Sequence, residues 1–181
     1  FFDIIGTGDI MIKTKSEFSE ALYQLLQTNK FEDITVNQII DASNKSRTTF
    51  YRYYKDKYQV LEYLFHTKLS PYLNHNREIF NYVQLAKEFI HFAKDNDDLF
   101  LNCIEDKQNT LIKLLYNQYI QMLTKIMPPL TNDELEVLYI YLHGTIMSGV
   151  SWKRKKITKS ADEKLHLFYL AMPEILKDKL K

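Results

Sequence analysis

The segment from Lys45 to Lys57, "KSRTTFYRYYKDK", has the residue types needed to bind a polyanion. Its thirteen residues include five cations, four aromatic rings and three Ser or Thr hydroxyls, but only one acid. Guanidinium groups bind guanine edges and phosphates through paired hydrogen bonds, and hydroxyls bind phosphates or bases. Since the formal net charge of the whole chain is only +1, any nucleic-acid binding must be local to this segment.

A helix that starts at Ser46 would divide this segment into two faces. At 100° per residue, Phe50, Tyr53 and Tyr54 cluster on one side, so we expect at least two of these rings to pack inward. The other side carries the polar set, which consists of Arg47, Thr48, Tyr51 and Arg52, with Thr49 on the flank. The segment therefore combines an aromatic anchor with a polar face that can read DNA.

The residues before this segment predict a second short helix and a tight turn. Thr35 and Gln38 have the spacing of a capping box, which predicts a helix from about Thr35 to Ser43. Asn44 suits the left-handed residue that ends a helix, and Ser46 suits an N-cap. An earlier amphipathic helix is predicted from apolar residues at helical spacing: Phe18, Ala21, Leu22, Leu25 and Leu26. Two short helices across a tight turn, resting on a preceding helix, form a helix-turn-helix unit.

Lys57 stands at an unusual place for a cation. Asp56 and Gln59 predict the start of another helix, so Lys57 falls at its first position. A cation there opposes the helix dipole at a cost of a few tenths to ~1 kcal/mol, whereas a bound anion would reverse the sign. A DNA phosphate is the natural candidate for that anion.

The sequence "ITVNQIIDASNKSRTTFYRYYKDKYQVLEYLF", residues 34–65, resembles the N-terminal DNA-binding module of the TetR family of bacterial transcription regulators. In that family the third helix enters the major groove. The resemblance implies base contacts from Arg47 and Thr48, and base or phosphate contacts from Arg52. It implies phosphate contacts from five further residues: Thr35, Asn37, Thr49, Tyr51 and Tyr53. Lys57 would bind a phosphate from the start of the next helix.

The turn departs from the family pattern, in which a Gly is followed by an apolar residue. Here the pair is Asn44 and Lys45, and Lys45 replaces an apolar plug with a cation that can add a contact to the DNA backbone. Lys45 and the N-cap Ser46 therefore complete the predicted DNA-binding set.

The composition is that of an all-α protein. Hydrophobic residues make up 45% of the 181-residue chain, which has only four Gly and four Pro. An all-β fold needs many turns marked by those residues, so we expect about nine helices. Pro71 is expected to end or bend the helix that follows Asp56. Later helices are predicted near residues 78–95, 98–106, 108–127, 132–150 and 160–171.

These elements suggest three parts. We expect a flexible leader over residues 1–12, a helix-turn-helix DNA-binding domain over residues 13–58, and a helical effector-binding and dimerisation domain over residues 59–181. The basic run Lys153–Lys156 is expected to be a solvated loop rather than a second DNA contact.

The TetR resemblance implies that the second half holds an effector pocket and a dimer interface. The candidate pocket residues are aromatic, and the alternative for each is an ordinary core position: Phe89, Phe92, Phe100, Tyr116, Tyr119 and Trp152. The helices near 132–150 and 160–171 are apolar on more than one face, which suits a two-fold four-helix interface. A pattern from His143 and Gly144 to Glu163 resembles a TetR subgroup that includes regulators of dihydroxyacetone kinase operons.

Other function classes have less support in the sequence. Cys103 is the only cysteine, so a disulfide framework and a cysteine metal site are excluded within one chain, and a reducing compartment fits. No apolar run approaches the ~18 residues of a membrane span. Two Glu-x-x-His pairs, Glu88–His91 and Glu163–His166, allow a di-metal carboxylate bundle as an alternative. However, Glu88 and His91 lie on the side of their helix opposite its apolar residues. They should therefore face solvent, unlike metal ligands in a bundle core.

We therefore expect a cytoplasmic, non-enzymatic regulator without a cofactor or metal. It is expected to bind a palindromic double-stranded operator as a homodimer, to act as a repressor, and to be released from DNA by a small-molecule effector that changes the spacing of the two reading helices. A co-regulator with the same fold, acting through protein partners without operator binding, is the main alternative.

Overall fold

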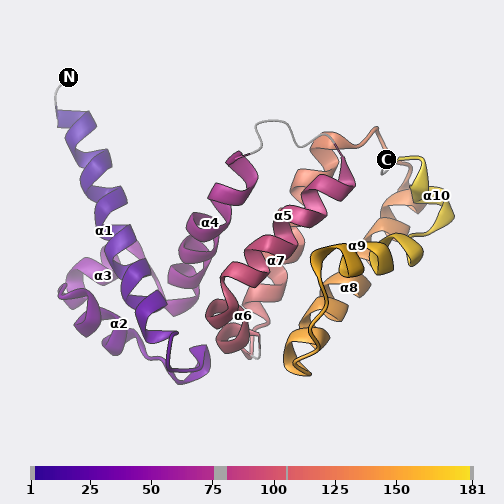
Figure 1. Ribbon diagram of the computed structural model, residues 1–181. Helices are drawn as coiled ribbons and strands as arrows, with labels where there is room; N and C mark the ends of the chain where they lie inside the picture. Colours follow the sequence, from indigo (N-terminus) through magenta and orange to yellow (C-terminus); the bar gives the residue numbers. More distant parts are fainter. Residues whose placement is uncertain (1–2, 76–80, 105, 180–181) are drawn as a thin grey trace. The chain divides into compact units, whose positions relative to one another are not determined.

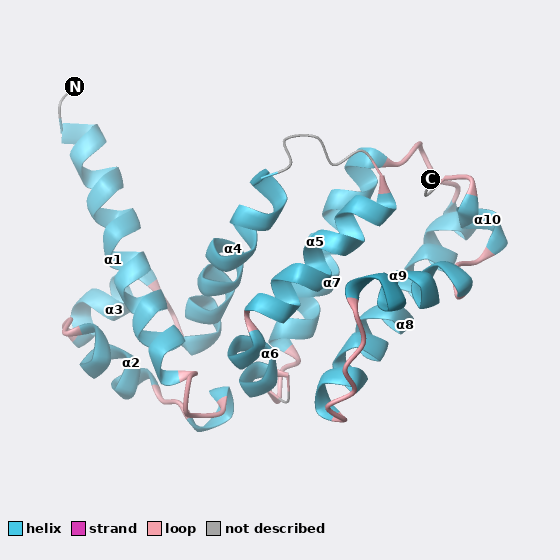
Figure 2. Cartoon of the chain, viewed as in Figure 1, coloured by secondary structure: helices cyan, strands magenta, loops and turns pink. Residues whose placement is uncertain are grey.

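The computed structural model describes residues 3–75, 81–104 and 106–179, and every regular element in those ranges is helical (Figure 1). Figure 2 shows the helices joined by short loops. The expected all-α class is therefore confirmed. None of the described helices is both long enough and apolar enough to cross a membrane.

The chain divides into two compact units that do not follow the order of the sequence. The first unit contains the residues up to Lys68 together with Asp98–Leu111, and the second contains Leu69–Asp97 together with the residues from Ile112 onward. The chain passes between the two units after Lys68, Asp97 and Leu111. The functional boundary expected near residue 58 stays a prediction. Sequence periodicity has no means of showing that a later segment returns to the first unit.

In the first unit, three helices pack against one another. They are α1 (Asp3–Leu25), α2 (Val36–Ser43) and α3 (Arg47–Tyr53), with the 3₁₀ turn η1 (Phe31–Asp33) between α1 and α2 and the start of α4 (Lys57–His75) after α3. Their apolar faces form a core with fully buried rings and aliphatic side chains: Phe18, Leu22, Leu26, Phe31, Ile39, Phe50, Leu61 and Phe65.

The segment Asp98–Leu111 is tied to this unit by hydrogen bonds. It covers most of α6 (Asp97–Cys103) and the start of α7 (Thr110–Ile126). The amide of Asn102 donates to the Leu26 carbonyl at 2.7 Å, and the backbone N–H of Lys107 donates to the Glu32 carboxylate at 2.7 Å. These bonds satisfy the end of α1 and hold the α6–α7 loop beside η1.

The second unit contains α5 (Tyr82–Asp95), α8 (Asn132–Arg154), α9 (Ala161–Leu170), α10 (Glu174–Lys177) and most of α7. α9 packs on α5, and α10 packs on α8. A hydrogen-bonded pair of tyrosines lies in its core: the hydroxyls of Tyr82 and Tyr141 are 2.7 Å apart, and Tyr141 also donates to the Phe168 carbonyl at 2.7 Å. Burial raises the pKa of both hydroxyls, so they stay protonated donors.

The predicted helix starts and stops agree closely with the structure. Thr35 forms the predicted capping box with Gln38. Thr131 and Ser160 form the same arrangement with Glu134 and Glu163, at the starts of the helices expected near 132–150 and 160–171. Asn44 ends α2 in the left-handed conformation with φ 54°, and Ser46 caps α3. These signals are local, because each depends on side chains within one turn of the backbone groups that they satisfy.

Three helices differ in extent from the expected ones. α1 begins at Asp3, inside the leader expected over residues 1–12. α4 continues through Pro71 to His75, so Pro71 does not end it. α8 extends to Arg154, so the basic run is not wholly a loop, and Lys153 donates to the Ala93 carbonyl at 2.9 Å. The sequence also did not predict η1 or α10, and residues 76–80 of the helix expected near 78–95 lie outside the described ranges.

The tyrosine pair yields a stability prediction. Tyr141→Phe should lower the free energy of unfolding by about 1–3 kcal/mol, because the Phe168 carbonyl loses its donor and the Tyr82 hydroxyl loses a partner inside the core. The measurement is chemical denaturation followed by circular dichroism. Tyr169→Phe removes a hydroxyl from a residue that is 53% exposed and should change the value by less than about 0.5 kcal/mol. Equal losses in both variants would contradict a specific role for the pair.

Candidate nucleic-acid interface

The turn between α2 and α3 is closed by its own polar groups. The backbone N–H of Asn44 donates to the Asp41 carbonyl at 3.2 Å, and that of Lys45 donates to the Ile40 carbonyl at 3.4 Å. The hydroxyl of Ser46 then accepts from the N–H of Thr49 at 3.1 Å, which starts α3. The left-handed Asn44 therefore reverses the chain without a glycine, as the sequence predicted.

Two aromatic rings anchor α3 to α1. Phe50 is fully buried and meets Phe18 edge to face, with ring centroids 5.2 Å apart. Tyr54, which follows α3, is 3% exposed, and its hydroxyl donates to the Lys15 carbonyl at 3.0 Å. Burial raises the pKa of Tyr54, because a phenolate would lose its hydration there. Tyr53 is only partly buried, so two of the three rings expected to face inward do so fully.

The opposite face of α3 is open. Arg47, Thr48 and Arg52 are exposed, and the Tyr51 ring is 48% exposed. Thr49 lies on the flank and is partly exposed, as the 100° spacing predicted. The outward face thus carries two guanidiniums, a phenol and a hydroxyl, and the chain has no acid between Asp41 and Asp56.

Arg47 lies across this face in a defined orientation. Its Nη1 donates to Oδ1 of Asn37 on α2 at 2.9 Å, and its guanidinium carbon lies 5.4 Å from the centroid of the Tyr51 ring. The sequence analysis assigned Asn37 to a phosphate and did not detect this bond. The two residues are ten positions apart and on different helices, so no pattern within one helix reports their contact.

Several hydroxyls of the expected set serve the helix starts. Ser46 and Thr49 are hydrogen-bonded to each other at 2.8 Å. Thr35 donates its hydroxyl to Oε1 of Gln38 at 2.9 Å and accepts from the Gln38 N–H at 3.3 Å. These residues therefore cap the starts of α2 and α3 in the DNA-free chain.

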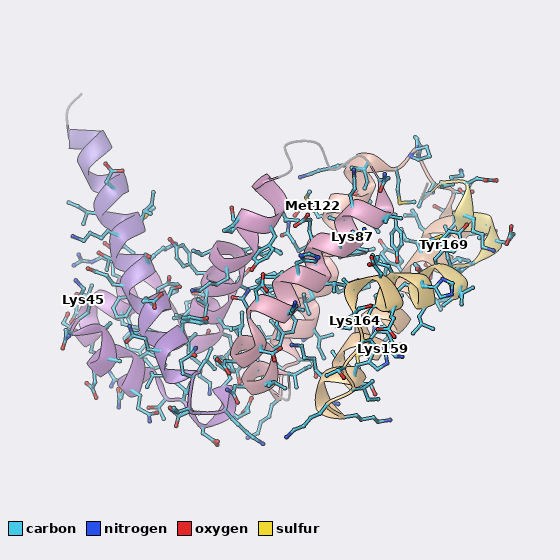
Figure 3. The ribbon with its side chains drawn as sticks, viewed as in Figure 1. Lys45, Lys87, Met122, Lys159, Lys164 and Tyr169 are labelled. Carbon is cyan, nitrogen blue, oxygen red and sulfur yellow. The ribbon has the colours of Figure 1, made fainter. Side chains whose placement is uncertain are left out.

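Lys45 forms an ion pair with α1. Its ammonium lies 2.7 Å from the Glu17 carboxylate, and both side chains are about one-third exposed. Lys45 is labelled in Figure 3. The cation that replaces the usual apolar residue thus holds the turn to α1 through charge. An ammonium has three donors, so a contact from Lys45 to a DNA phosphate stays a prediction.

Lys57 has a role that the sequence did not predict. Its ammonium donates to three backbone carbonyls at the end of η1, at 2.7 Å to Phe31, 2.9 Å to Glu32 and 2.8 Å to Ile34. An ammonium has three donors, so all of them are engaged. The Nζ also lies 4.6 Å from the centroid of the Phe31 ring. Burial lowers the pKa of Lys57, against the opposing effect of Glu32.

This arrangement corrects the interpretation of the cation at the start of α4. The ammonium does not stay at the positive end of the helix dipole, because its long stem carries it to the negative ends of three peptide groups. In this arrangement all three donors of the Lys57 ammonium are engaged by carbonyls. The phosphate contact that the TetR resemblance implies for Lys57 stays a prediction.

The six aromatic residues expected at an effector pocket differ in burial. Phe89, Phe92, Phe100 and Tyr119 are buried, whereas Tyr116 and Trp152 are partly exposed. In the second unit, Phe89 meets Tyr119 with ring centroids 4.6 Å apart, and Trp152 stacks on Phe168 at 5.6 Å. Buried Phe89, Phe92 and Tyr119 therefore contribute to the core of that unit, and the effector pocket stays a prediction.

The di-metal alternative has no geometric support in the described part of the chain. His91, Glu163 and His166 are exposed, and the described residues contain no group of three or more His, Cys, Asp or Glu side chains arranged to hold a metal ion. Cys103 is buried, and burial raises the pKa of its thiol, which disfavours the reactive thiolate.

Comparisons with known proteins agree with this description. No protein-family model matches the chain. The HTH-type dhaKLM operon transcriptional activator DhaS of Lactococcus lactis subsp. lactis (strain IL1403) is 25% identical over 85 residues, and the aligned part spans only about half of either protein, 47% of this chain and 46% of the relative.

Two solved structures are similar over almost the whole chain. A TetR transcriptional regulator from Streptococcus agalactiae 2603V has a TM-score of 0.61 and 20% identity, and the dihydroxyacetone kinase operon activator DhaS has a TM-score of 0.57 and 17% identity. In both cases the match covers 94% of this chain and 99% of the other. The chain therefore has the fold of TetR-like regulators, and the resemblance inferred from residues 34–65 is confirmed at the level of the fold.

The carbonyl contacts of Lys57 predict a structural defect when they are lost. Lys57→Ala should lower the free energy of unfolding by on the order of 2 kcal/mol, because three carbonyls lose a charged donor. Lys55→Ala removes the same charge from an exposed position two residues earlier and should cost less than about 0.5 kcal/mol. Thermal and urea denaturation of both variants check this. If the two variants were equally stable, the carbonyl contacts would have no energetic weight.

Proposed function

We propose that this chain is a transcription regulator that binds double-stranded DNA by inserting α3 into the major groove. The observation that carries the proposal is the division of α3. A helix of seven residues is fixed by buried Phe50 and leaves Arg47, Thr48, Tyr51 and Arg52 outward, in a chain with the TetR-like fold. Solvent alone does not require two guanidiniums and a phenol on one short, acid-free face.

The proposed contacts follow from the chemistry of each group. Arg47 and Thr48 contact base edges near the start of α3, and Arg52 contacts a base or a phosphate. Tyr51 and Tyr53 contact phosphates through their hydroxyls. Four residues at the helix starts set the orientation of the backbone beside the phosphates: Thr35, Lys45, Ser46 and Thr49. Lys57 contributes to the phosphate contacts through the first turn of α4, where it is the first residue.

We propose that the active form is a homodimer through α8 and α9. Large apolar side chains are exposed on these helices and on α10: Tyr139, Ile140, Leu167, Tyr169, Leu170 and Ile175. Tyr169 is labelled in Figure 3. A Cβ added at Gly144 or Gly149 meets no atom within 4 Å, so both mid-helix glycines leave space for an approaching helix. Two copies related by a two-fold axis present two α3 helices, which suits a palindromic operator.

The effector and the direction of regulation complete the proposal. A small molecule bound in the second unit would act by favouring one spacing of the two α3 helices.

The relatives include a protein described as an activator, so the expected repressor role rests on no comparison. A rise of target transcripts in a deletion strain would indicate a repressor, and a fall would indicate an activator. Since such a protein acts at the chromosome, we place it in the bacterial cytoplasm.

Genomic footprinting of the full chain, followed by binding of the recovered sequences to purified protein, tests the central claim. We expect a palindromic site. We also expect the affinity for DNA to fall strongly as the salt concentration rises, because lysines and arginines that bind phosphates displace the counterions condensed on the DNA. If the purified protein is a folded dimer that does not bind duplex DNA at low ionic strength, the result would instead favour the co-regulator function.

Arg47 should determine base preference. Arg47→Ala should cost about 1–3 kcal/mol at the preferred sequence and should equalise the four bases at one position of each half-site, because the bidentate contact is lost. Fluorescence anisotropy with a panel of single-base operator variants measures this. Lys125→Ala, which removes an exposed charge from α7, should leave the preference unchanged. An intact preference in Arg47→Ala would remove Arg47 from the reading residues.

Ile140 should be central to the dimer. It is 73% exposed, so Ile140→Glu should leave the folded chain intact but weaken association, because a carboxylate would be buried between the subunits. Sedimentation equilibrium should show monomers at micromolar concentration and a lower operator affinity. Val83→Glu, at a residue of α5 that is 42% exposed, serves as the matched control and should remain dimeric. A dimeric Ile140→Glu variant would place the interface elsewhere.

A further inference from the structure

We propose that Asn37 is a positioning residue for base recognition, and that it acts through Arg47. This inference rests on the proposed DNA binding and adds a specific claim to it. The base preference at the position contacted by Arg47 depends on a neutral amide of α2, which itself need not touch that base. The sequence analysis assigned Asn37 only a phosphate contact.

The geometry places Asn37 where it can restrain the Arg47 side chain. Asn37 is the second residue of α2, directly after Val36, and the capping box at Thr35 fixes the backbone there. Its Oδ1 accepts from Nη1 of Arg47 at 2.9 Å, although Arg47 lies across the turn at the start of α3. The contact is exposed on both sides, so DNA can reach the guanidinium without displacing a buried group.

Tyr51 restrains the same side chain from a second direction. It lies one turn after Arg47 on α3, and its ring centroid is 5.4 Å from the guanidinium carbon. A guanidinium near an aromatic ring is attracted by the electron-rich face of that ring. The Asn37 oxygen on one side and the Tyr51 ring on another therefore confine a side chain that would otherwise sample many rotamers.

The chemistry of Asn37 suits a positioning role. A guanidinium has five N–H donors, and the bond to Asn37 uses one on Nη1, so the remaining donors can still pair with the O6 and N7 acceptors of guanine. The partner is a neutral amide rather than a carboxylate. It orients Arg47 without neutralising the charge that attracts DNA, whereas Lys45 in the same turn has a carboxylate partner, Glu17.

Pre-orientation has a measurable consequence. A free arginine loses rotamer entropy when it is fixed on DNA. If part of that ordering already exists in the free protein, Arg47 adds more binding free energy at the preferred base than a mobile side chain would. The loss of Asn37 should therefore reduce discrimination between bases more than it reduces binding to DNA in general.

Asn37→Ala is the test, with the full-length dimer and the panel of single-base operator variants. We expect the ratio of affinities for the preferred and the other bases to fall about three- to ten-fold at the Arg47 position and to stay unchanged elsewhere. The salt dependence of binding should not change, since no charge is removed. An unchanged urea midpoint relative to the parent protein confirms that the fold is intact.

A double variant separates positioning from a direct contact. Asn37→Ala combined with Arg47→Ala should show the same base preference as Arg47→Ala alone, because Asn37 has nothing left to orient. If Asn37→Ala instead weakens all operator variants by the same factor, Asn37 is only a phosphate contact and this inference is wrong, while the proposed function stands. If the parent protein does not bind duplex DNA, the proposed function itself fails.

Discussion

The burial of Phe50 and Tyr54 is the constraint on which the candidate interface depends. α3 has seven residues, too few for a helix to be stable by itself in water. Its stability must come from packing, and its two buried rings supply that packing against α1 through Phe18 and the Lys15 carbonyl. Because these contacts occupy one side completely, the polar side chains are directed outward by geometry rather than by their own preference for water.

The turn η1 joins the separate parts of the first unit. Its carbonyls accept from the Lys57 ammonium of α4, and the Glu32 carboxylate accepts from the backbone N–H of Lys107. The residue after Ile34 is the N-cap of α2. One three-residue turn thus sets the position of the helix before α3, the helix after it, and the α6–α7 loop. A charged side chain that satisfies three carbonyls is well suited to this role, since an unpaired carbonyl away from water is costly.

The second unit uses a different kind of restraint. Its core holds tyrosine hydroxyls that bond one another and a backbone carbonyl, and no described buried side-chain polar atom lacks a partner. A satisfied polar network favours one packing of the helices over others. At the same time α8, α9 and α10 leave large apolar side chains in water, which a monomer does not need. This open apolar surface is the observation that supports the proposed dimer.

The sequence alone determined helix caps and helix faces, which depend on neighbours within about one helical turn. The capping boxes at Thr35, Thr131 and Ser160, the left-handed Asn44 and the two faces of α3 all follow from the types and spacing of nearby residues. Tertiary structure alone decided which distant groups meet. Arg47 donates a hydrogen bond to Asn37, and Lys45 forms an ion pair with Glu17. Lys57 donates to carbonyls of η1, and the segment Asp98–Leu111 belongs to the first unit. Long flexible side chains reach partners that are set by the packing of whole helices, so their roles cannot be read from spacing along the chain.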